Sequence, residues 1–131
     1  MGNSPEKIKN LSIHIENSAG TYKSFETEGD LLWERYPLKG VTYPVDYGYI
    51  DGYQGEDGAE LDVFVGSGNL NGYMKVWRMD VPEETKFFKD LTLDELDKVL
   101  ETFKSVLVSH KRIINPNLFF KEIEKFKIEK K

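Results

Sequence analysis

The chain has 131 residues, of which 39% are hydrophobic, 13% aromatic and 31% charged, so its composition excludes a disordered tail and fits one folded domain. The net charge of −5 excludes a global basic field for nucleic acid or anionic membrane, and the absence of cysteine excludes disulfides and thiolate chemistry. We expect a single domain over residues 1–131, located in the cytoplasm because the N-terminus carries no apolar signal segment.

The part of the chain before the helices has a β-rich pattern. Leu11, Ile13 and Ile15 alternate with polar residues, as in a half-buried strand, and a turn at 17–20 leads into a returning strand over 21–26. Further strands are expected at 31–33, 63–65, 73–79 and 85–88, with glycine-rich turns at 48–58 and 66–72. Many short strands with frequent turn signals favour a closed barrel.

Two helices are expected in the last third of the chain. Thr92 and Glu95 form a capping box, and apolar residues then follow helical spacing up to Leu107. Asn115-Pro116 is typical of a helix start, with Pro at the first helical position. The fold class predicted is therefore α+β and mainly β, with one or two C-terminal helices.

The segment with the clearest chemical content runs from Tyr43 to Val65 and reads YPVDYGYIDGYQGEDGAELDVFV. Gly48 permits close backbone approach between two tyrosines. Asp57 lies in a turn and Asp62 near the start of an apolar strand. Clustered carboxylates of this kind suit Mg²⁺, which prefers oxygen ligands. From these residues alone, a solvated acidic loop is the favoured interpretation.

Other motifs are missing from the sequence, and this narrows the chemistry. It contains neither a Walker A loop, nor HExxH, nor a complete EF-hand series. His14 and His110 stand alone, which is typical of surface histidines rather than metal ligands.

The Tyr43 to Val65 segment resembles the signature YPxNYGYI…DGDPxDVxV of the family I inorganic pyrophosphatases. The similarity extends over residues 11–107 and identifies a short and divergent member. It implies a five-stranded, OB-like β-barrel flanked by helices. It also implies Mg²⁺-dependent hydrolysis of pyrophosphate to two phosphates by a metal-activated water, with Mn²⁺ or Zn²⁺ as substitute metals.

The resemblance also assigns roles to residues across the chain. The implied metal ligands are Glu16, Asp57, Asp62, Asp80 and Glu84. The implied phosphate-binding residues are Lys23, Arg35, Tyr47, Lys86 and Lys104. Asp57, Glu60 and Tyr47 are the catalytic candidates. The assignment is physically consistent, because a polyanion needs cations around it and the carboxylates repel one another unless metals lie between them.

Three positions depart from the family pattern. Ala59 stands where the family has the Asp that helps activate water, and Glu60, its neighbour in an extended chain, points to the opposite face. Glu84 stands where Asp is usual, and Phe103 replaces a phosphate-binding Tyr. Loss of a general base typically costs about 10²–10⁴ in rate.

Two alternatives follow from these departures and from the aromatic residues. Because of Ala59, the chain is alternatively an impaired pyrophosphate- or nucleotide-binding protein, or a hydrolase of another phosphoanhydride. A third interpretation is an OB-like module that stacks single-stranded nucleic acid on its aromatic residues, which the net charge opposes. The expected partner is therefore pyrophosphate or a related phosphoanhydride, without nucleic acid or membrane, and a homo-oligomer is allowed.

Overall fold

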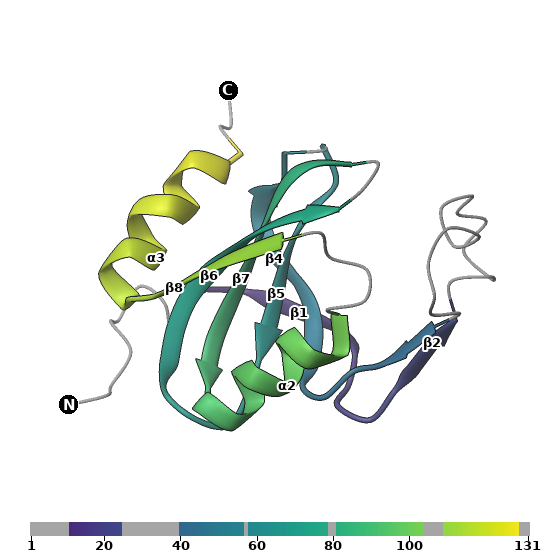
Figure 1. Ribbon diagram of the computed structural model, residues 1–131. Helices are drawn as coiled ribbons and strands as arrows, with labels where there is room; N and C mark the ends of the chain where they lie inside the picture. The colour runs from purple at the N-terminus through teal and green to yellow at the C-terminus, as the bar shows by residue number, and fades with distance from the viewer. Residues whose placement is uncertain (1–10, 25–39, 57, 79–80, 104–108, 129–131) are drawn as a thin grey trace.

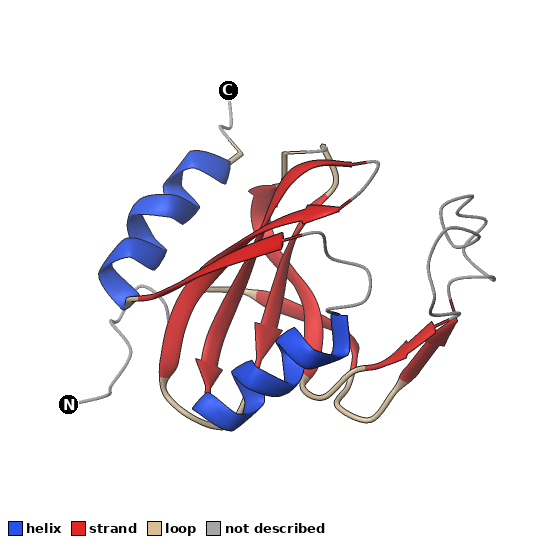
Figure 2. Cartoon of the chain, viewed as in Figure 1, coloured by secondary structure: helices blue, strands red, loops and turns tan. Residues whose placement is uncertain are grey.

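The computed structural model describes residues 11–24, 40–56, 58–78, 81–103 and 109–128 (Figures 1 and 2). Its strands are β1 Ile13–Asn17, β2 Tyr22–Ser24, β3 Gly40–Thr42, β4 Asp46–Gln54, β5 Glu60–Val65, β6 Leu70–Arg78, β7 Val81–Leu91 and β8 Ser109–Ile114. Its helices are α2 Leu93–Phe103 and α3 Pro116–Ile123, the latter continued by a 3₁₀ turn, η3, at Glu124–Phe126.

Six of these strands form one mixed sheet in the order β1-β4-β5-β7-β6-β8, while β2 and β3 pair separately and project to one side (Figure 1). All neighbours are antiparallel except β5 and β7, which run parallel. The mainly β, α+β class is confirmed. The expected five-stranded barrel is not confirmed, because six of the described strands form an open sheet that does not close.

The first hairpin and the long glycine-rich turn were predicted wrongly. The returning strand β2 pairs with β3, whereas β1 pairs with β4. β4 continues through the region expected to turn, and its Gly48 makes this possible: a Cβ there would overlap the carbonyl oxygen of His14 on β1. The local glycine content indicated a turn, but Gly48 instead allows two strands to approach each other closely.

The sheet buries an apolar cluster on each face, because successive strand residues point to opposite sides. Phe64 and Phe88 belong to the cluster beneath α2, which contributes Leu96 and Val99. Their neighbours on the two strands face the other way and belong to the cluster beneath α3, which comprises Ile50, Leu61, Val63, Phe87, Phe119 and Ile123. The two helices therefore cover different faces of the sheet (Figure 2).

Both helix starts match the sequence. Glu95 N donates to Thr92 Oγ1 at 3.0 Å and Thr92 N donates to Glu95 Oε1 at 2.8 Å, which is the predicted capping box. The side chain of Asn115 caps α3 by accepting from the amides of residues 117 and 118. Among the described residues, no helix has the length and apolarity needed to cross a membrane.

One expected strand lies outside the described residues, and one observed strand was not predicted. The strand expected at 31–33 lies outside the described residues. β8, at Ser109–Ile114, was not predicted, because most of its residues are polar and its apolar pair comes only at the end. Its pairing with β6 alone specifies it as a strand.

Candidate active site

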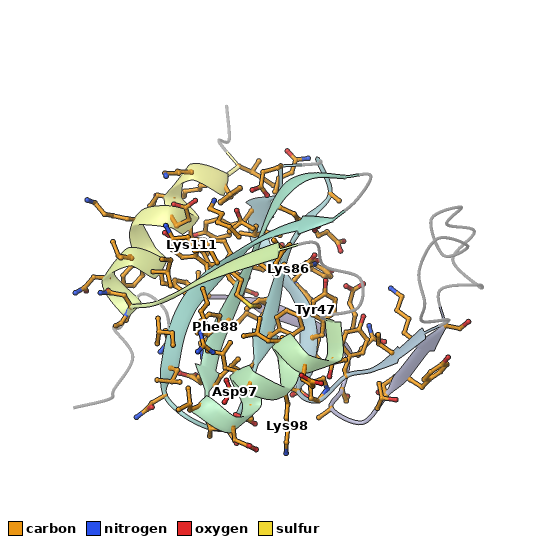
Figure 3. All side chains as sticks on the ribbon, viewed as in Figure 1. Tyr47, Lys86, Phe88, Asp97, Lys98 and Lys111 are labelled. Carbon is orange, nitrogen blue, oxygen red and sulfur yellow. The ribbon has the colours of Figure 1, made fainter. Side chains whose placement is uncertain are left out.

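Polar side chains on the α2 face of the sheet surround the ammonium group of Lys86. Lys86 Nζ lies 2.8 Å from Asp62 Oδ2, 3.4 Å from Glu84 Oε1 and 3.2 Å from the Tyr47 hydroxyl. These contacts engage all three of its N–H donors. Figure 3 shows Tyr47 and Lys86 close together over the central strands. Four residues with predicted site roles, carried by three strands, therefore meet at one point.

The strand pairings explain why these four residues meet. Tyr47 on β4 pairs with Phe64 on β5, two residues beyond Asp62. The parallel β5–β7 register sets Val63 opposite Phe87, so the preceding residues on both strands, Asp62 and Lys86, are also neighbours. Residues two apart on a strand share a face, which adds Glu84 to the cluster.

Tyr47 is held in place by aromatic packing. Its ring stacks on Tyr43 at 4.9 Å between centroids with 11° between planes, and contacts Phe64 at 4.8 Å. Burial raises the pKa of Tyr47 well above its usual range, outweighing the opposite effect of Lys86. The phenol therefore stays protonated and can donate a hydrogen bond, while its oxygen accepts one from Lys86 Nζ at 3.2 Å.

The charge of Lys86 is maintained by its surroundings. Burial lowers the pKa of Lys86, but Tyr47, Asp62 and Glu84 raise it more, and the resulting pKa lies well above the ordinary value. The side chains of Lys86 and Asp62 are 19% and 22% exposed. This cluster is therefore a partly desolvated cation bound by two carboxylates, an arrangement in which charges interact more strongly than in water.

Glu60 lies on the same face of β5 as Asp62, because both belong to the strand and are two residues apart. Its neighbour Ala59 precedes the strand, and both residues are exposed. Because Ala59 precedes the strand, alternation along β5 does not test whether Glu60 faces away from the position of Ala59, as expected. Its position relative to Asp57 cannot be compared, since Asp57 lies outside the described residues.

The structure describes only some of the other predicted site residues. Glu16 lies in β1 at the register shift between Ile15 and Asn17, and Asn17 pairs with Tyr47 on the next strand. Lys23 lies on β2, in the separate two-stranded sheet. Arg35, Asp57, Asp80 and Lys104 fall outside the described residues, and only the backbone of Phe103 is described.

The structure adds two polar residues that the sequence analysis did not single out. Thr85, between Glu84 and Lys86, is buried and its hydroxyl bonds to Glu56. Strand alternation alone would have placed Thr85 on the face opposite Lys86. Nothing in the sequence links it to Glu56, which is 29 residues away.

The donor set of the cluster fits a divalent metal. Carboxylate oxygens are the ligands that Mg²⁺ prefers, and Asp62 and Glu84 already converge on one cationic group. Within the described ranges, no three acidic or histidine side chains gather as a complete metal site. Two of the expected ligands, Asp57 and Asp80, are not among those residues.

Comparison with known proteins connects this geometry to a family. The sequence model of the inorganic pyrophosphatase family matches residues 4–106. An inorganic pyrophosphatase from Corynebacterium glutamicum is 36% identical over 58 residues, which are 42% of this chain and 37% of that protein. The matched segment thus spans well under half of that relative.

Two solved structures match the chain at low sequence identity. A crystal structure described as an inorganic phosphatase from Anaplasma phagocytophilum has a TM-score of 0.49 and 16% identity, over 96% of each chain. An inorganic pyrophosphatase from Ehrlichia chaffeensis has a TM-score of 0.46 and 17% identity, over 88% of this chain and 89% of its own. The family match covers most of the chain, including the Tyr43 to Val65 signature and the Lys86 cluster. The chain therefore belongs to the family I inorganic pyrophosphatases.

Proposed function

We propose that this protein hydrolyses inorganic pyrophosphate to two phosphates, using Mg²⁺ and an activated water. The observation that supports this most directly is the Lys86 ammonium held between Asp62 and Glu84 in a chain of this family. A site that keeps a desolvated cation next to carboxylates can bind both a phosphate anion and a divalent metal.

The carboxylates Asp62 and Glu84, together with Glu16, Asp57 and Asp80, would hold the metal. Bound Mg²⁺ would supply Lewis acidity, lowering the pKa of a water and neutralising phosphate charge. Mn²⁺ and Zn²⁺ are proposed as substitutes.

The protein's own residues would bind and orient the substrate. Lys86 would exchange a carboxylate contact for a phosphate oxygen, and Lys23, Arg35 and Lys104 would add positive charge around the anion. Tyr47, kept protonated by burial, would donate its hydroxyl hydrogen to a phosphate oxygen. Its packing against Tyr43 and Phe64 would fix the direction of that hydrogen bond.

A base is needed to take the proton from the attacking water. Asp57 and Glu60 are the candidates, because Ala59 can accept no proton. Glu60 is exposed and shares a strand face with Asp62, which supports it for this role.

The test is phosphate release from pyrophosphate with Mg²⁺, Mn²⁺ or Zn²⁺. Asp62→Asn should abolish most of the release, because it removes a charge that contacts Lys86 at 2.8 Å. Asp97→Asn is the matched control: Asp97 is 62% exposed and pairs with Arg112 on the surface. If the wild-type protein releases no more phosphate than Asp62→Asn with any of the metals, this function is wrong.

Ala59 supports a second candidate: binding of pyrophosphate or a nucleotide with little hydrolysis, or hydrolysis of another phosphoanhydride. Calorimetry would then detect metal-dependent binding without pyrophosphate turnover. Ala59→Asp would raise turnover by about 10²–10⁴ if a missing base is the defect. An Ala59→Asp protein that is no faster would contradict this explanation.

The wider setting of the protein stays predicted rather than tested. These predictions are a cytoplasmic location, a single domain over residues 1–131, no nucleic-acid or membrane partner, and a homo-oligomer.

A further inference from the structure

The small sheet of β2 and β3, which we call the arm, turns one of its faces toward the apolar cluster beneath α2. Lys23 pairs with Val41, and the side chains of directly paired residues lie on the same face of an antiparallel sheet. Val41 is 3% exposed and belongs to that cluster. The adjacent pair, Tyr22 and Thr42, is exposed on the other face. Lys23 therefore lies on the side of the molecule that carries the Lys86 cluster.

Backbone hydrogen bonds join the arm to Tyr43, in the segment that leads from β3 into β4. Gly20 N donates to Tyr43 O at 2.8 Å, and Tyr43 N donates to Thr21 O at 3.0 Å. The ring of Tyr43 stacks on Tyr47, whose hydroxyl lies 3.2 Å from Lys86 Nζ. The residue that holds the arm by its backbone thus also holds Tyr47 by its ring.

The turn that leads into the arm is held by a side chain of β4. Ala19 N donates to Oδ1 of Asp46, the first residue of β4, at 2.8 Å. Thr21 N donates to Ser18 O at 3.0 Å, which closes the turn on itself. Gly20 within it has a φ of 90°, which glycine adopts without strain. Because the turn is closed internally, the Asp46 carboxylate fixes the point from which the arm extends.

We propose that Asp46 is a positioning residue, which holds the turn before the arm so that Lys23 presents its ammonium group to the same phosphate anion as Lys86. Asp46 touches no substrate in this account and acts through Lys23. The inference rests on the proposed function, in which both lysines bind phosphate. Two ammonium groups carried by separate sheets can contact one anion together only if the sheets keep a fixed relative position, and the Asp46 hydrogen bond is a link between them.

Substitutions at Asp46 separate the hydrogen bond from the charge. Asp46→Ala removes the acceptor but leaves the two backbone hydrogen bonds at Tyr43, so the arm remains attached. Asp46→Asn removes the charge and keeps an oxygen that can accept from Ala19 N. Asp51→Ala is the matched control, since Asp51 lies on the same strand, carries the same charge and is 66% exposed. Asp46→Glu displaces the carboxylate by one methylene and is the second test, should Asp46→Ala fail to fold.

Two measurements give the outcome without any turnover. Amide hydrogen exchange by NMR at Ala19 reports the hydrogen bond, with Ile50 in β4 as the check that the sheet is intact. Calorimetric titration with inorganic phosphate, in buffer with MgCl₂, reports anion binding.

The titrations form a double-mutant cycle between Asp46 and Lys23. We expect Asp46→Ala to speed exchange at Ala19 and to weaken phosphate binding about threefold or more. Lys23→Met should weaken it about 10–100-fold, as loss of a hydrogen bond to a charged group does, and adding Asp46→Ala to Lys23→Met should cause no further loss. Asp46→Asn and Asp51→Ala should resemble the wild type.

The results distinguish failure of this inference from failure of the proposed function. Unchanged phosphate affinity in Asp46→Ala, when Lys23→Met weakens it, would overturn the inference alone. An equal loss from Asp46→Ala with and without Lys23 would also overturn it, because Asp46 would then act by another route. Unchanged affinity in Lys23→Met, or a wild type that binds no phosphate, would overturn the inference together with the phosphate-binding role of Lys23. A protein that shows the expected pattern but releases no phosphate from pyrophosphate would retain the inference and refute only the proposed reaction.

Discussion

Lys86→Met is the most informative single change, because it removes the group around which the site is built. Methionine has about the length of the lysine stem and carries no charge. Asp62 and Glu84 would then face each other without the ammonium that now lies 2.8 Å from one and 3.4 Å from the other. The folded protein should lose stability in the absence of metal, and Mg²⁺ should restore it.

The size of the loss follows from the burial of the three side chains. They are 14–22% exposed, so the charges are largely but not completely withdrawn from water. Removing one partner of a buried pair costs about 3–5 kcal/mol, and the residual exposure reduces this to about 2–4 kcal/mol. For a chain of this length, such a loss lowers Tm by roughly 10 °C. Mg²⁺ at a hundred times its Kd returns about 2.7 kcal/mol.

Thermal unfolding in EDTA and in MgCl₂ measures both effects. Lys98→Met is the matched control, since the Lys98–Asp94 pair is 3.0 Å long but 63% and 76% exposed. A surface pair of this kind contributes about 0.3–0.5 kcal/mol. We expect Mg²⁺ to raise the Tm of Lys86→Met more than that of the wild type, where the ammonium competes for the same carboxylates. Equal stability of the two methionine variants in EDTA would refute this reasoning.

Three further predictions test the scaffold. Gly48→Ala should separate β1 from β4, since a Cβ would overlap the His14 carbonyl, and backbone amide exchange in β1 should rise strongly. Phe119→Ala should cost about 3–5 kcal/mol in urea unfolding, because Phe119 is fully buried with its ring 5.0 Å from that of Phe87; a loss under 1 kcal/mol would mean that α3 is not docked there. Burial raises the pKa of Glu95, but hydrogen bonds from Ser67 and from its capping-box partner Thr92 lower it more, to a net pKa below 4.5. Its stabilisation is therefore complete above pH 4.5 and lost as the pH falls through the lowered value, so Glu95→Gln should flatten the acid limb of the stability curve.

Local sequence patterns predicted the helices and most strands correctly. The capping box at Thr92 and the Asn-Pro start at Asn115 are signals that operate within one helical turn, and both form as expected. The alternation at Ile13 and Ile15 likewise gave β1. These elements depend on neighbours in the chain, which is the information that a sequence shows directly.

Pairing between strands could not be predicted in the same way. Gly48 was expected in a turn, because only the backbone of β1 shows why a glycine is needed inside β4. β2 pairs with β3 across the interval from Ser24 to Gly40, so its apparent hairpin with β1 was wrong. Family resemblance named Asp62 as a metal ligand and Lys86 as a phosphate-binding residue, and the structure brings the two side chains together at 2.8 Å. The roles themselves stay predictions.

The parallel pairing of β5 and β7 is the step that makes the site possible. It aligns Asp62 with Lys86, although 23 residues separate them in the chain. The alternation along β7 then divides its functions between two faces: Glu84 and Lys86 enter the cluster, while Thr85 points to Lys75 and helix α3. Any shift of β7 by one residue would exchange these faces and place a threonine in the site and a lysine in the apolar layer. The hydrogen bonds of Thr85 with Lys75 and Glu56, together with the apolar cluster beneath α3, oppose that shift from the far side of the sheet, so the register of β7 depends on residues outside the Lys86 cluster.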